Sequence, residues 1–197
     1  IFATGGTATD YGDLPDATTP RNMGNPAHGG INLDDIQLPS VTYMPGSGRG
    51  IVQQVGTPSN SNVNYIDIPT LGNSIDFGDL TVARTFSGGV SSLTRAVAGG
   101  GSSPNLDNTI DAVEMAHLGN YSDFGNLSVA RSRPAGFGST TRGCIAGGDT
   151  PSKSDVIDYI TIASAGDATD FGNLTEARTD KPGGLSSSTR GVVGGGA

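Results

Sequence analysis

The chain has 197 residues, a formal net charge of −8 and a pI near 4.4, which argues against nucleic-acid binding because that needs a basic face. Its single cysteine, Cys144, excludes an intrachain disulfide framework, and no apolar run approaches the roughly 20 residues of a membrane-spanning helix. Glycine is about twice as frequent as usual. Because β-branched residues alternate between the glycine runs, this composition indicates tight turns rather than disorder.

The first segment, residues 1–49, is irregular. Asp10 begins the pentapeptide DYGDL, a loose form of a phrase that returns three times. From Asp10 to Arg49 the chain takes 39 residues, whereas the same interval in a clear copy is 19, so residues 15–48 hold about 20 extra positions. They are either a decayed repeat or an inserted arm that contacts a partner, and we favour the insertion.

The rest of the chain is built from a regular repeat. The pentapeptides DFGDL, DFGNL and DFGNL begin at Asp76, Asp123 and Asp170, so consecutive copies lie 47 residues apart. A fixed period of this size indicates stacked copies of one supersecondary unit. Within a single domain, the chain therefore divides into the irregular segment 1–49 and three units at 50–100, 101–148 and 149–197, the last ending with the first strand of a further unit.

Each unit is predicted to contain three or four short strands. In the last copy, alternating β-branched residues at 156–162 are typical of a strand, and Val192 and Val193 form another short strand before a glycine run. The DFG phrase is interpreted as a turn. Almost no helix is expected, since no window keeps the apolar spacing of an amphipathic helix. Polar loops are predicted at 101–108, 149–155 and 179–188.

The order of residues within a unit resembles a kelch repeat. Two glycines, a tyrosine, an aromatic residue, a leucine, Ala-Arg and two further glycines follow one another. The last copy carries these positions at Gly147, Gly148, Tyr159, Phe171, Leu174, Arg178, Gly194 and Gly195. The resemblance implies an all-β fold, a kelch-like β-propeller or a segment of one, with four-stranded blades of about 47 residues. Phe77, Phe124 and Phe171 stand where kelch units usually have tryptophan, so this is a divergent branch.

The variant of the phrase found here, set among Gly, Ser and Thr, is similar to repeats in virion and tail proteins of marine phages, especially cyanophages. This resemblance implies a non-enzymatic structural or adhesive protein on the virion surface or tail, such as a tail fibre, a tail tip or a capsid-surface component. The implied partners are other virion proteins and a host-surface glycan or protein. A homo-oligomer is expected too, because an open propeller end exposes a strand edge.

Specificity is expected in the polar loops, because loops on a rigid frame suit recognition. The candidate binding positions are Ser102, Asn105, Thr150, Lys153, Asp180 and Lys181. The alternative function is a secreted or cell-surface bacterial binding module of the same fold. A third hypothesis, an enzyme with a copper or sugar-cleaving site, needs a unique His, Tyr and Cys cluster that the sequence does not display, so no catalytic residue is assigned.

The acidic, aromatic and basic positions of the repeat are assigned to the architecture, because a catalytic site needs each group once. They are Asp76, Phe77, Arg84, Arg95, Asp123, Phe124, Arg131, Arg142, Asp170, Phe171, Arg178 and Arg190. We expect the aspartate of each phrase to pair with one of the two arginines that follow it, since an arginine fork binds a carboxylate and carbonyls together. Each arginine is expected to join its own blade to a neighbour.

No metal or cofactor is predicted. The DFG phrase occurs in protein kinases, where its aspartate holds magnesium, but this chain has no VAIK or HRD sequence. Calcium needs six to eight oxygens, and Asn126 and Asn173 replace the second carboxylate of the phrase in two copies. The only histidines, His28 and His117, are far apart and form no zinc set.

The two ends of the chain both fall inside a repeat. Ile1 stands shortly before Asp10 much as Ile162 stands before Asp170, and the final glycines match the first strand of a unit. Either the ends share one blade and close a ring, or further repeats lie outside this segment. We favour the second interpretation because a shared blade would lack one strand.

Overall fold

The protein is all-β in the residues that the computed structural model describes, which are 48–53, 59–180 and 182–196. Strands β1 to β13 occupy these residues, and no helix is present among them, which confirms that the fold is all-β. In the same residues there is no helix of the length and apolarity that crossing a membrane requires. The predictions for the irregular segment lie outside the described residues, except at Gly48 and Arg49.

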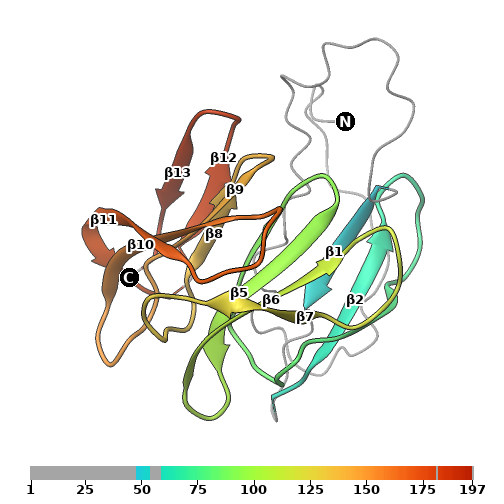
Figure 1. Ribbon diagram of the computed structural model, residues 1–197, viewed down its shortest axis with the longest axis horizontal. Helices are drawn as coiled ribbons and strands as arrows, with labels where there is room; N and C mark the ends of the chain where they lie inside the picture. The colour runs from blue at the N-terminus through green and yellow to red at the C-terminus, as the bar shows by residue number, and fades with distance from the viewer. Residues whose placement is uncertain (1–47, 54–58, 181, 197) are drawn as a thin grey trace.

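The strands form four antiparallel sheets, each a meander in chain order (Figure 1). The first sheet comprises β1 (Arg49–Gln53), β2 (Asn62–Asp67) and β3 (Ile75–Asp79). The second comprises β4 (Gly88–Ser91), β5 (Arg95–Ser102), β6 (Leu106–Glu114) and β7 (Ser122–Asn126). The third comprises β8 (Ala135–Gly138), β9 (Arg142–Ala146), β10 (Ser154–Thr161) and β11 (Thr169–Arg178), and the fourth β12 (Gly183–Ser186) and β13 (Gly191–Gly194).

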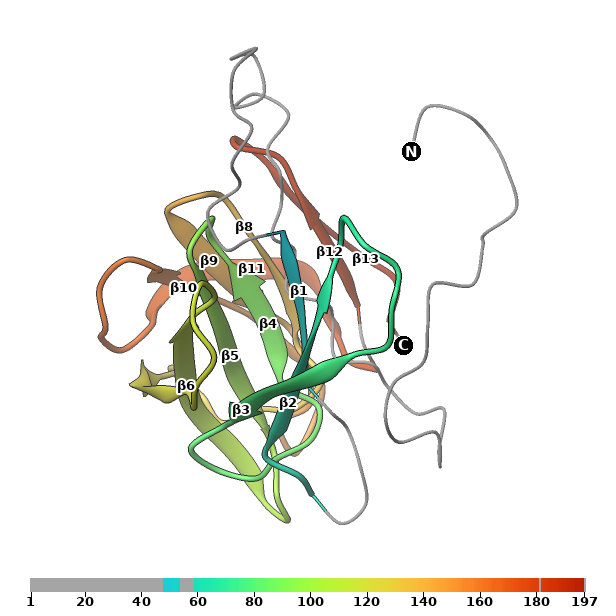
Figure 2. The same ribbon diagram turned by 90° about the vertical axis from the view of Figure 1, so that its right-hand side faces the viewer.

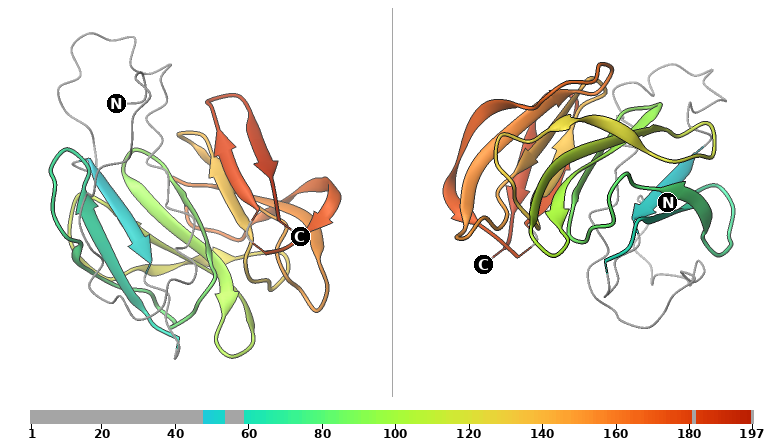
Figure 3. Two further views of the ribbon diagram at one scale, coloured as in Figure 1. Left: turned by 180° about the vertical axis from the view of Figure 1, so that it is seen from behind. Right: turned by 60° about the horizontal axis from the view of Figure 1, so that its bottom comes forward.

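The sheets follow one another in chain order through the molecule (Figures 2 and 3). Their first strands meet, since β4 contacts β8 and β8 contacts β12. The strands predicted at 156–162 and at Val192 and Val193 are confirmed as β10 and β13. The division into units at 50–100, 101–148 and 149–197 stays a prediction.

Glycines allow the first strands to approach closely. A Cβ atom added to Gly136 would lie 2.0 Å from the carbonyl oxygen of Gly89, and one added to Gly184 would lie 2.3 Å from that of Gly136. The prediction of a continuous loop at 179–188 is wrong, because Gly183–Ser186 forms β12. The loop predicted at 101–108 is also too long, because β5 ends at Ser102 and β6 begins at Leu106. Glycine, which usually favours turns, here allows neighbouring backbones to touch.

The DFG phrase forms a bulged strand and not the predicted turn. Val63 on β2 pairs with Gly78, but its neighbour Asn64 pairs with Asp76, so Phe77 is the extra residue of a β-bulge. The same shift recurs between β6 and β7 and between β10 and β11. The aspartate braces the bulge locally, since Asp123 Oδ1 accepts a hydrogen bond from the backbone N–H two residues on.

The core lies between consecutive sheets. One buried cluster joins the first and second sheets and consists of Ile51, Val63, Tyr65, Phe77, Leu80, Ala96, Ala98, Met115 and Tyr121. The other joins the second and third sheets and consists of Val90, Val97, Ile110, Ala112, Phe124, Leu127, Ile145, Ile160 and Ile162. Equivalent repeat positions fill both clusters, so each sheet obtains its core from its neighbour.

Candidate functional site

A buried ion pair joins the second and third sheets. Arg131, in the connection from β7 to β8, places Nη2 2.7 Å from Asp158 Oδ2 on β10, and both side chains are buried. Arg131 also donates to the carbonyl oxygens of Ile145 and Val156. Its own backbone N–H bonds to Asp107 O in the second sheet. Arg131 therefore links two sheets through one residue.

The hydroxyl of Ser128 completes the site around Asp158. Its Oγ donates to Asp158 Oδ1 at 2.7 Å and its N–H donates to Oδ2 at 3.0 Å. Burial lowers the pKa of Arg131, while the Asp158 carboxylate opposes that change. A buried charge is retained only with such partners, so the carboxylate and the guanidinium depend on each other.

The same site occurs one repeat earlier. Arg84 Nη1 lies 3.0 Å from Asp111 Oδ2, with both side chains fully buried, and Thr81 Oγ1 donates to Asp111 Oδ1 at 2.7 Å. We call these two sites the Arg–Asp links. Their recurrence at two successive interfaces is consistent with an architectural use of the repeat arginines.

The Arg–Asp links correct the predicted pairing. Arg84 and Arg131 pair not with the aspartates of the DFG phrase but with Asp111 and Asp158, which lie outside the phrase. A signal was available, because Asp158 alternates in phase with Ile160 and Ile162, which are buried. An acid on the apolar face of a strand indicates a buried partner.

The second repeat arginine also crosses between sheets. Arg49 Nη1 donates to Met115 O, and Arg95 Nη1 donates to Ile162 O, each at 2.9 Å. Arg95 additionally pairs with Glu114 at 2.7 Å near the surface. The third member of this set, Arg142, lies over the ring of Tyr159 instead, 4.5 Å from its centroid.

Most of the predicted binding positions lie in loops, and some of these loops meet. Asn105 and Lys153 are exposed in the β5–β6 and β9–β10 connections, and Thr150 is half-buried in the second of these. Ser102 is also half-buried, but it is the last residue of β5 and not a loop residue. Asp180 is exposed 3.8 Å from Arg133, which also pairs with Asp149. The β9–β10 loop and the β11–β12 connection are thereby brought together. Lys181 lies outside the described residues.

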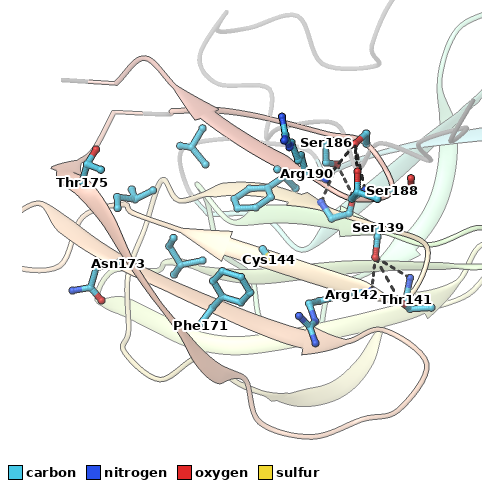
Figure 4. Close-up of a pocket in the computed structure, with 18 residues that line it drawn as sticks. Ser139, Thr141, Arg142, Cys144, Phe171, Asn173, Thr175, Ser186, Ser188 and Arg190 are labelled. Atoms are coloured by element: carbon cyan, nitrogen blue, oxygen red, sulfur yellow. Dashed lines mark hydrogen bonds between the residues drawn. The ribbon is translucent and has the colours of Figure 1, made fainter. Parts of the chain in front are cut away.

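A cleft of about 750 Å³ opens between the third and fourth sheets (Figure 4). Its apolar lining includes Phe137, Ile157, Phe171 and Leu174. Figure 4 shows Phe171 and Arg142 on one wall and Arg190 on the other. Hydroxyl groups gather at one end of the cleft and belong to Ser139, Thr141, Ser186, Ser187, Ser188 and Thr189.

The cleft combines an apolar wall with two cations, Arg142 and Arg190. Tyr159 and Phe171 meet edge to face with ring centroids 6.0 Å apart, which holds the aromatic wall in place. Cys144 also lines the cleft and is 7% exposed, as expected for a small buried residue. Burial raises the pKa of its thiol, although Arg142 opposes the change. This arrangement suits the binding of a partner with apolar and acidic groups.

In the described residues, no three His, Cys, Asp or Glu side chains gather as metal ligands would. No protein-family model matches the chain, and no curated protein matches it in sequence.

Proposed function

We propose that the four sheets are blades of a kelch-like β-propeller or of a segment of one. Support comes from the four-stranded meander of the second and third sheets and from the contacts among β4, β8 and β12, the first strand of each blade. Radial repetition of such sheets is the arrangement of a propeller. The Arg–Asp links then fix the angle between neighbouring blades.

We further propose that the protein is a non-enzymatic structural or adhesive component of a phage particle, on the virion surface or tail. The observation that supports this role is the repeated Arg–Asp link, which uses the charged groups of the repeat to build a rigid frame. Polar loops on that frame, which include Asn105, Thr150, Lys153 and Asp180, are available for contacts with a host-surface glycan or protein and with other virion proteins.

Antibody labelling tests this proposal. An antiserum against the purified chain is applied to purified phage particles and, separately, to intact bacteria, and gold particles are counted in the electron microscope. Label on tails or capsids supports the proposal. Label confined to uninfected bacterial surfaces contradicts it and indicates the alternative, a cell-surface or secreted binding module of the same fold.

Loop variants test the adhesive part. Replacing Asn105, Thr150, Lys153 and Asp180 together by alanine should abolish binding of the chain to host cells while leaving the melting temperature within a few degrees, because none of the four side chains is buried. A control variant changes Glu114→Gln, at the end of β6 opposite the loop that holds Asn105. Equal binding by the loop variant and the control would reject these loops as the contact surface.

A further inference from the structure

The open side of the third sheet carries one half of an interface that the chain completes twice elsewhere. Phe171 is 56% exposed, whereas its equivalents Phe77 and Phe124 are 2% and 5% exposed. Gly78 and Gly125 touch a loop of the next sheet, but a Cβ atom on Gly172 would meet nothing within 4 Å. The same local sequence is therefore covered in two copies and open in the third.

Strand β13, across the cleft from this side, also has an edge without a partner strand in the described residues. In the second and third sheets, β5 and β9 pair on both sides. In the described residues, β13 pairs with β12 alone. At the free edge of β13, the register of the other sheets would set an aspartate opposite Val193, because Asp111 pairs with Ala98 and Asp158 with Ile145.

Polar groups on the open side repeat those of the completed interfaces. Arg178 stands where Arg84 and Arg131 stand, but its side chain is 32% exposed and bonds to Glu176 and to Gly195 O. Thr175 stands where Thr81 and Ser128 bind an aspartate, and it lines the cleft. The open side thus holds the arginine and the hydroxyl of a third Arg–Asp link.

The remaining contacts of the completed interfaces come from one hairpin of the incoming sheet. At the second interface the β10–β11 hairpin supplies Asp158, the apolar residues Ile160 and Ile162, and Gly166, whose N–H donates to Phe124 O at 2.7 Å. Asp167 Oδ1 accepts from the N–H of Asn126. At the first interface the β6–β7 hairpin makes the corresponding contacts with Phe77 O and Asp79 N.

From this correspondence we infer that the cleft between the third and fourth sheets is a docking site for a β-hairpin of the same repeat. The first strand of the hairpin pairs with the free edge of β13. Its aspartate forms a third Arg–Asp link with Arg178 and Thr175, and its apolar residues cover Phe171 and Leu174. A carbonyl oxygen just beyond its first strand accepts from Arg142, as Ile162 O does from Arg95.

The chain itself supplies the probe. A synthetic peptide with the sequence of residues 154–173 contains the groups that the β10–β11 hairpin contributes to the completed interface, and it is titrated against the full chain by fluorescence anisotropy. We expect saturable binding. The Asp158→Asn peptide should bind about thirtyfold more weakly or worse, because it lacks the partner of a buried arginine. The matched control is the Asp155→Asn peptide, which loses the same charge at a position that bonds within its own hairpin.

Variants of the chain test the other half of the site. Arg178→Gln should weaken binding as much as Asp158→Asn does in the peptide, and Phe171→Ala should weaken it several-fold. Both side chains are partly exposed, so circular dichroism should show folded variants. When the Arg178→Gln chain is combined with the Asp158→Asn peptide, the loss of binding free energy should be smaller than the sum of the two single losses. Such non-additivity identifies a direct contact between the two residues.

Two outcomes overturn the inference. They are the absence of peptide binding, and equal binding of the Asp158→Asn and Asp155→Asn peptides. If the peptide does not bind but the chain self-associates in sedimentation and Arg178→Gln abolishes that association, the cleft is assigned to a second copy. The inference uses only the repeat geometry, so its failure does not affect the virion proposal. If the antiserum labels bacterial surfaces alone, the virion proposal fails but the inference is unaffected.

Discussion

The guanidinium of Arg131 and the carboxylate of Asp158 meet at 2.7 Å with no more than 1% of either side chain exposed. The two residues are separated by 27 positions in the chain. Arg131 follows the last strand of the second sheet, and Asp158 lies in the third sheet. Burial of this kind makes each charge dependent on the other, because an unpaired charge in an apolar interior is strongly unfavourable.

Removing the arginine of a buried link should therefore be costly. We expect Arg131→Ala to lower the free energy of unfolding by about 3–5 kcal/mol, since Asp158 stays buried without its cation. Arg178→Ala is the matched control and should cost about 1 kcal/mol or less, because that side chain is partly exposed. Urea unfolding monitored by circular dichroism measures both. Equal losses would show that the link contributes nothing beyond a surface ion pair.

Alanine variants at two glycines of the DFG phrase distinguish destabilisation by backbone strain from destabilisation by a close contact. Gly125 and Gly172 both have positive φ, 149° and 133°, so alanine at either position carries a strain of about 1–3 kcal/mol. At Gly125 the added Cβ would also lie 2.4 Å from Gly166 O. We expect Gly125→Ala to be the more destabilising by at least about 1 kcal/mol. Thermal unfolding of the two variants that gave equal shifts would contradict the close packing of the second and third sheets.

The carboxyl of Asp107 should make stability depend on pH. Burial alone would raise its pKa, but hydrogen bonds from Thr109, with a contribution from Arg84, hold the pKa below its ordinary value of 3.8. Because the folded pKa is the lower one, the carboxylate stabilises the fold above the ordinary pKa, and this contribution is lost as the pH falls through the folded value.

Asp107→Asn tests that pH dependence with a side chain of the same shape. The difference in unfolding free energy between the parent chain and the variant should be constant above about pH 5 and shrink below about pH 4. Thr109→Val, which removes the hydroxyl donor but keeps the backbone N–H, should lose part of the same dependence. A difference that does not change between acid and neutral pH would show that these hydrogen bonds do not favour the charged form.

The thiol of Cys144 should be slow to react. Burial raises its pKa, and the thiolate is the reactive form, so modification by a disulfide reagent near pH 8 should be at least about tenfold slower than in urea. The control places a cysteine at the equivalent position of the fourth sheet, on β13, by combining Cys144→Val with Val192→Cys. Val192 is 62% exposed, and its cysteine should react without denaturant. Equal rates for the two cysteines would mean that the sheet around Cys144 opens readily.

Much of the strand pattern was predictable from the sequence. The 47-residue period located the repeats, and the alternation at 156–162 located β10, because both signals are local. The strand β12 was missed since Gly183 and Gly184 resemble a loop when read alone. Their function is to allow the approach of a neighbouring backbone, and that neighbour lies 48 residues away in the chain, at Gly136.

The candidate site could not be predicted from the local sequence. Phe124 and Phe171 lie in the same DFGNL phrase, yet one is 5% and the other 56% exposed. They differ because the third sheet covers Phe124, whereas the fourth sheet, which has two strands in the described residues, leaves Phe171 open, so no property of the phrase predicts the cleft. The partners of the arginines were missed for a related reason, because a period states that contacts recur but not which residues meet.

The spacing of the Arg–Asp links has a consequence for the gene. Each link reaches 27 residues forward, and the second link lies 47 residues after the first. Unequal crossing-over between homologous positions of two copies deletes or inserts one whole copy, wherever in the copy the exchange falls. Each arginine between two remaining sheets then still meets an aspartate, so a population can vary the length of this array without creating an uncompensated internal charge. Insertions of other lengths between an arginine and its aspartate have no such protection.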